Sequence, residues 1–185
     1  MACTPAQARR VADPAALKGV TLGLPTPADA RPTPGIGCGQ LVQDLPLRAH
    51  KALVAAFSDA GATASNSDTG HWVLKVALRE ATLGEENTRE HRGDRAAANP
   101  NAGMLGGPDF PPLDQQPSLF NSGNGNAVVV LDAALSREGS VVWTASVTGH
   151  DQSAPCVQAI DKVREALDDA VDELRDRVVP LLRTQ

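Results

Sequence analysis

Three segments of this 185-residue chain show a side-chain pattern with a period of two. In residues 71–83, Trp72, Leu74 and Val76 share one face. Lys75 and Arg79 share the other. The alternation returns in residues 126–137 and 140–149, and the polar, glycine-containing turn between them predicts an antiparallel hairpin. A strand of this pattern buries one face and exposes the other, so the chain needs a second layer to cover its sheet.

Two helical segments can supply that layer. In residues 155–182, apolar side chains recur every three or four positions, which indicates a helix with one apolar stripe. Pro155 suits its first turn, and Pro180 is expected to end or bend it. A second helix is predicted after Asp44, with Pro46 in its first turn and Gly61 at its end.

With a short strand at 19–24, the order becomes strand, helix, strand, loop, strand, strand, helix. We predict an α+β two-layer sandwich: a sheet of about four mostly antiparallel strands with two helices on one face. Residues 1–18 are expected to be a flexible N-terminal tether, and residues 19–185 a single domain.

A long irregular insertion is expected at 84–125, which contains seven glycines and five prolines. It either packs on the core, remains disordered, or contacts a partner. Its scattered apolar residues are the candidate partner contacts: Met104, Leu105, Phe110, Leu113, Leu119 and Phe120.

Composition argues against several classes of function. Aromatic residues make up 3% of the chain and the net charge is −5, so neither a nucleic-acid surface nor an aromatic sugar-binding cleft is expected. The four histidines are scattered without metal-ligand spacing. The glycine run at 35–39 lacks the spacing and the acidic partner of a dinucleotide loop. We therefore expect no metal, no cofactor and no enzymatic activity.

Cys38 and Cys156 each precede a predicted helix. If both helices cover the same face of the sheet, these cysteines could approach each other and form a disulfide, which would close a long loop and stabilise the fold by up to roughly 4–5 kcal/mol. The alternative is two separate buried thiols.

The N-terminus resembles that of a bacterial lipoprotein whose signal peptide has been removed. Cys3 would be the lipidated first residue, with the small Ala2 before it and Thr4 after it, a sequence that in such proteins fits sorting to the outer membrane. The alternative is a native N-terminus with an incidental cysteine.

The segments 20–24, 45–60, 71–83, 126–149 and 156–182 follow an order that resembles small envelope lipoproteins of Gram-negative bacteria. These include auxiliary lipoproteins of ABC-type transport systems and the lipoprotein of the lipopolysaccharide assembly machine. The resemblance implies a periplasmic, non-enzymatic docking subunit of an envelope protein complex, attached to the outer membrane by its lipid alone.

A second interpretation is a lipid or small-molecule binding module with a cleft between helices and sheet. An open groove lined by Trp72 and Trp143 would favour lipid binding, and a filled core with exposed apolar residues would favour docking. A histidine beside a serine or an aspartate in a pocket would favour catalysis.

Overall fold

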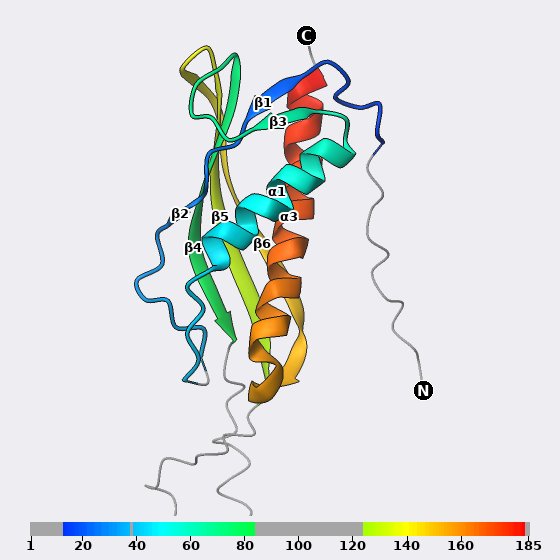
Figure 1. Ribbon diagram of the computed structural model, residues 1–185. Helices are drawn as coiled ribbons and strands as arrows, with labels where there is room; N and C mark the ends of the chain where they lie inside the picture. Colours follow the sequence, from blue (N-terminus) through cyan, green and yellow to red (C-terminus); the bar gives the residue numbers. More distant parts are fainter. Residues whose placement is uncertain (1–12, 38, 84–123, 184–185) are drawn as a thin grey trace, which may run out of the picture.

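A computed structural model describes residues 13–37, 39–83 and 124–183. Both α-helices lie on one face of a single sheet (Figure 1). The elements are β1 (Thr21–Gly23), β2 (Ala28–Asp29), α1 (Leu45–Asp59), β3 (Thr63–Ser65), β4 (Trp72–Leu83), β5 (Asn124–Arg137), β6 (Ser140–Pro155), the short 3-10 helix η1 (Cys156–Gln158) and α3 (Ala159–Arg183). The α+β architecture agrees with the prediction.

The sheet differs from the predicted one in strand number and direction. It has six strands in the order β3-β1-β4-β5-β6, with β2 also pairing with β4. The pairs β4–β5 and β5–β6 are antiparallel, as the alternation indicates. The pairs of β1 with β3 and β4, and of β2 with β4, are parallel, so the sheet is mixed. The expected sheet of about four mostly antiparallel strands, and its order, were therefore wrong.

The inner face of the sheet packs against the helices. Leu74, Leu131 and Val147 lie on neighbouring strands of this face and are fully or almost fully buried. They join the buried stripe of α3, which includes Val163 and Leu167, in one hydrophobic cluster. The helices are thus held to the sheet by apolar burial, as period-two strands and striped helices predict.

Helix α3 differs at both ends from its prediction. It begins at Ala159 because β6 continues to Pro155 and η1 intervenes. It also continues through Pro180 to Arg183. Val178 and Leu182, on either side of the proline, are buried. Their burial offsets the hydrogen bond that proline removes from the last turns.

The packed part of the chain begins before β1. The expected tether ran to residue 18, and its residues 1–12 lie outside the described part of the chain. Leu17 is 1% exposed, and its amide donates to the carbonyl of Ala60. Arg183 at the end of α3 lies 3.6 Å from the Asp13 carboxylate and also donates to the carbonyl of Ala16.

Candidate functional site

The sheet face opposite the helices carries a hollow of about 560 Å³. It lies over the middle of β4, β5 and β6, with Ala28 of β2 at its margin. Side chains of this outer face are small or polar, which leaves the surface shallow. The lining residues are Ala28, Lys75, Val76, Ala77, Asp132, Ala133, Ala134, Thr144, Ala145 and Ser146.

Strand register brings the polar groups of this hollow together. Lys75 is aligned with Ala134 and Thr144 across the three strands, and Asp132 is aligned with Ser146. The hydroxyl of Ser146 donates to Asp132, whose carboxylate lies 3.5 Å from the guanidinium of Arg79. The Asp132 carboxylate is therefore already engaged by a hydrogen bond from Ser146 and an ion pair with Arg79.

Lys75 differs from that cluster. Within the described residues no hydrogen bond or ion pair engages its ammonium group, and the side chain is exposed. The free ammonium group of Lys75 lies beside small side chains and the hydroxyl of Thr144, where it can pair with an acidic side chain of a partner.

The alternation at 71–83 places Lys75 and Arg79 on one face. Their alignment with Asp132 and Ser146 depends on register, which sequence reasoning did not reach.

The space between helices and sheet is filled. Trp72 is 7% exposed and belongs to the hydrophobic core, while Trp143 is half-buried against it. The guanidinium of Arg137 lies 5.6 Å from the centroid of the Trp72 ring, a cation–π contact at the end of the core where Trp72 lies. Neither tryptophan lines the hollow on the outer face of the sheet. The hollow is therefore not the cleft between helices and sheet that a lipid-binding module was expected to have.

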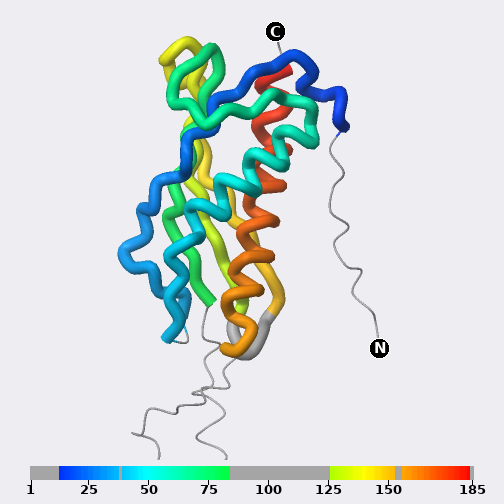
Figure 2. Tube along the Cα trace, in the orientation of Figure 1, coloured from blue at the N-terminus to red at the C-terminus, as the bar shows by residue number. Residues whose placement is uncertain are grey.

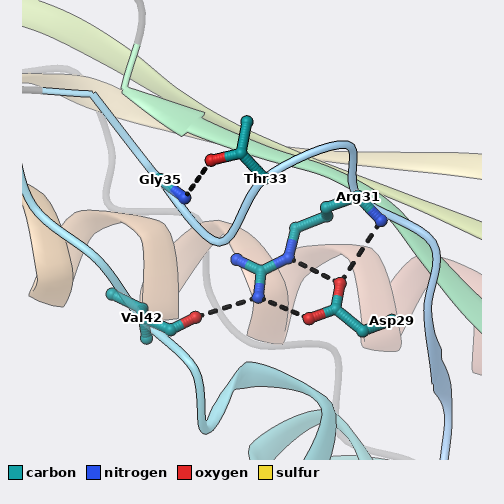
Figure 3. Close-up of polar contacts among 5 residues, drawn as sticks. All are labelled: Asp29, Arg31, Thr33, Gly35 and Val42. Atoms are coloured by element: carbon teal, nitrogen blue, oxygen red, sulfur yellow. Dashed lines mark hydrogen bonds and ion pairs between the residues drawn. The ribbon is translucent and has the colours of Figure 1, made fainter.

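A buried arginine fastens the irregular segment between β2 and α1 (Figure 3). The side chain of Arg31 is 2% exposed and donates twice to the Asp29 carboxylate, at 2.8 Å each, and once to the carbonyl of Val42 at 2.9 Å. These hydrogen bonds lower the pKa of the Asp29 carboxyl below its ordinary value. Thr33 accepts from the Gly35 amide in the same loop. No sequence motif indicates the pairing of Arg31 with Asp29.

Cys156 is disulfide-bonded. Its expected partner, Cys38, lies outside the described residues, so the pairing remains a prediction. Gln40 donates to the carbonyl of Cys156 at 2.9 Å, which places the turn after residue 37 beside η1. The lipidation candidate Cys3 lies outside the described residues, as do the candidate contacts of the insertion: Met104, Leu105, Phe110, Leu113, Leu119 and Phe120.

Several large apolar side chains are exposed outside the core. Val141 and Val142 are 61% and 54% exposed at the start of β6, and Val157 is 86% exposed in η1. Leu41 and Leu47 are exposed near the start of α1. Single exposed apolar side chains are common on protein surfaces, whereas Val141 and Val142 are adjacent and form a small apolar patch that is a candidate for contact with another molecule.

Two of the histidines in the described part of the chain, His50 and His71, contact residues of other segments. The Nε2 atom of His50 lies 2.9 Å from the carbonyl of Leu24, and His71 lies 3.2 Å from the Glu138 carboxylate.

Among residues 13–37, 39–83 and 124–183, no group of three potential ligands could hold a metal ion. Within the same ranges, no helix is both long and apolar enough to cross a bilayer.

This layering of two helices on one face of a mixed sheet is shared with a solved bacterial structure. A Xanthomonas campestris protein of family DUF330 has a TM-score of 0.54 and 16% identity, covering 94% of this chain and 92% of its own. At that identity the similarity shows the fold alone.

Weaker similarities fall below a TM-score of 0.5. They include PelC from Paraburkholderia phytofirmans (0.46, 14% identity, 94% and 95% of the two chains) and a minor lipoprotein from Acinetobacter baumannii (0.45, 9% identity, 89% and 94%). No protein-family model matches the sequence, and no curated protein matches it significantly.

Proposed function

We propose that this protein is a non-enzymatic periplasmic lipoprotein, attached to the outer membrane through lipid on Cys3, and an accessory subunit that docks onto an envelope transport or assembly complex. Its docking surface is the outer face of the sheet around Lys75. The partner is a protein that offers an acidic side chain to this hollow.

One observation carries the docking role. The inner face of the sheet is packed solid against α1 and α3, while the outer face holds a shallow hollow with the free cation Lys75 at its margin. A packed core and an open surface of mostly small apolar side chains with a few polar groups suit contact with a protein better than enclosure of a small molecule.

Site-specific photocrosslinking in the bacterium that carries the gene tests this role. A photoreactive amino acid at Thr144 lies in the hollow, and the matched control at Lys51 lies on the exposed side of α1. We expect one adduct of defined mass with an envelope protein from position 144, and none from position 51. Adding Lys75→Glu should remove the adduct because it reverses the charge offered to an acidic partner.

Two outcomes would contradict the proposal. One is the same set of adducts from both positions, which would indicate random encounters. The other is an adduct from position 144 that survives Lys75→Glu unchanged, which would exclude the lysine from the interface.

A further inference from the structure

We infer that the tip of the β5–β6 hairpin, residues 137–142, contacts the phospholipid surface of the membrane that holds the lipid anchor. This inference rests on the proposed lipidation of Cys3 and adds an orientation and a second membrane contact. It makes Val141 and Val142 membrane-facing side chains.

The chain enters the described fold at the same end of the molecule as this hairpin. Asp13 pairs with Arg183 at the last residue of α3. Helix α3 follows β6 and runs back along it, with Ala166 and Ala170 packed directly on Gly149. The end of α3 and the start of β6 therefore lie at one end of the molecule, as Figures 1 and 2 show. We call this end the anchor end.

The length of the tether decides which end can reach the membrane. Residues 4–12 separate Cys3 from Asp13, and ten Cα–Cα steps span at most roughly 36 Å. Helix α3, with 25 residues, is about 37 Å long. A fully stretched tether would only just bring the opposite end, where Val157 lies, to the bilayer. Any shorter path excludes that inverted orientation and keeps the anchor end, where the tether joins the domain, close to the bilayer.

The hairpin tip has the surface chemistry for that position. Val141 and Val142 are more than half exposed, although valine is commonly buried. The β5–β6 register passes from Leu135 opposite Trp143 to Ser136 opposite Val141, so Val142 is an extra residue without a partner on β5. Such a bulge redirects side chains away from the regular sheet. Two adjacent valines at the tip thus remain available for burial.

Charge does not explain a membrane contact at this end. The charged side chains of the described residues at the anchor end carry no excess of positive charge, because three cations stand against four carboxylates: Lys18, Arg137, Arg183, Asp13, Asp59, Asp68 and Glu138. Contact should therefore depend on the valines, and it should occur on neutral phosphatidylcholine without anionic lipid.

The test attaches the full chain to vesicles at the position of the proposed anchor. A hexahistidine tag replaces residues 1–3, and the vesicles contain brominated phosphatidylcholine with a nickel-chelating lipid. One variant carries Val141→Trp, and the matched control carries Val157→Trp at the opposite end. Both positions are highly exposed, so the added tryptophan needs no repacking of the core. Circular dichroism checks that both variants are folded.

Bromine quenches tryptophan fluorescence only at short range. We expect strong quenching of the tryptophan at position 141, and no quenching at position 157 beyond that of the unsubstituted chain. In the native sequence, Val141→Ser with Val142→Ser should abolish quenching of the neighbouring Trp143. Equal quenching at both positions, or quenching at position 157 alone, would overturn the inference. Trp143 quenching that survives the serine variant would overturn it as well.

The outcome is separable from the proposed function because the tag supplies the tether. If Cys3 carries no lipid in the cell, the proposed anchoring fails while the vesicle result stands. If position 141 is not quenched while the native precursor is acylated, the hairpin contact fails and the lipoprotein assignment stands.

Discussion

At the residue scale, a few side chains and one glycine fix how the layers meet. A Cβ atom on Gly149 would lie 1.9 Å from the carbonyl oxygen of Ala166 and 2.5 Å from the amide nitrogen of Ala170. Both are backbone atoms of α3, so they cannot rotate away. This glycine allows the helix to lie directly on β6.

We therefore expect Gly149→Ala to lower the free energy of unfolding by about 3 kcal/mol, because the helix must move off the sheet. Thr148→Ala is the matched control: it is adjacent, exposed and on the other face, and should cost at most about 1 kcal/mol. Urea unfolding followed by circular dichroism measures both. Equal losses for the two variants would show that α3 does not press on Gly149.

Arg31 gives a second prediction at this scale. Arg31→Met keeps an apolar stem but removes the hydrogen bonds to Asp29 and Val42, and should lower the free energy of unfolding at neutral pH by about 2 kcal/mol. The variant is compared with the native chain by urea unfolding at neutral pH and at about pH 2.

The pH dependence follows from the lowered pKa of Asp29. A carboxyl whose folded-state pKa lies below its unfolded value stabilises the protein above the unfolded pKa, and loses that effect as pH falls through the folded pKa. The difference between native chain and variant should therefore shrink at low pH. A difference that grows on acidification would contradict the ion pair.

At the scale of elements, the long strands, the helices and the short strand β1 could be predicted from the sequence, and β2 and β3 could not. Periodicity identifies a strand such as β4 or a helix such as α3 because many residues repeat the pattern. Strands β2 and β3 have two and three residues, which is too few for a period. The parallel pairing of β1, β2 and β3 depends on tertiary contacts, so it could not be predicted even for β1.

The candidate site also contains residues whose positions could be predicted from the sequence and residues whose positions could not. Lys75 and Arg79 could be assigned to a polar face, because alternation sets the face of every residue in a strand. Their neighbours on β5 and β6 could not be assigned, since a shift of one residue in pairing would turn Asp132 and Ser146 to the other face. Cys156 could be singled out because it stands at the start of a predicted helix.

The disulfide prediction also belongs to this scale. We expect a non-reducing peptide map to join the peptides that contain Cys38 and Cys156, because Gln40 already holds the neighbouring turn against η1. Cys38→Ser should then cost a few kcal/mol of stability, up to roughly 4–5, while Cys3→Ser should cost none. A map that shows Cys38 as a free thiol would contradict the pairing.

At the scale of the whole molecule, the two faces of the sheet and the two ends of the domain have separate roles. The inner face holds the helices, and the outer face is the proposed docking surface. In the orientation we propose, the anchor end faces the membrane, and the opposite end, with η1, faces away from it. This arrangement keeps the hollow around Lys75 accessible while the protein is attached to the membrane.

The most direct test of the central claim is where the full precursor is found in a Gram-negative bacterium. The account predicts that the native protein incorporates labelled fatty acid and sediments with the outer membrane. Cys3→Ser should prevent both and leave the protein as folded as the native chain, because Cys3 precedes the packed residues. An unacylated native protein recovered in the cytosol would contradict the account.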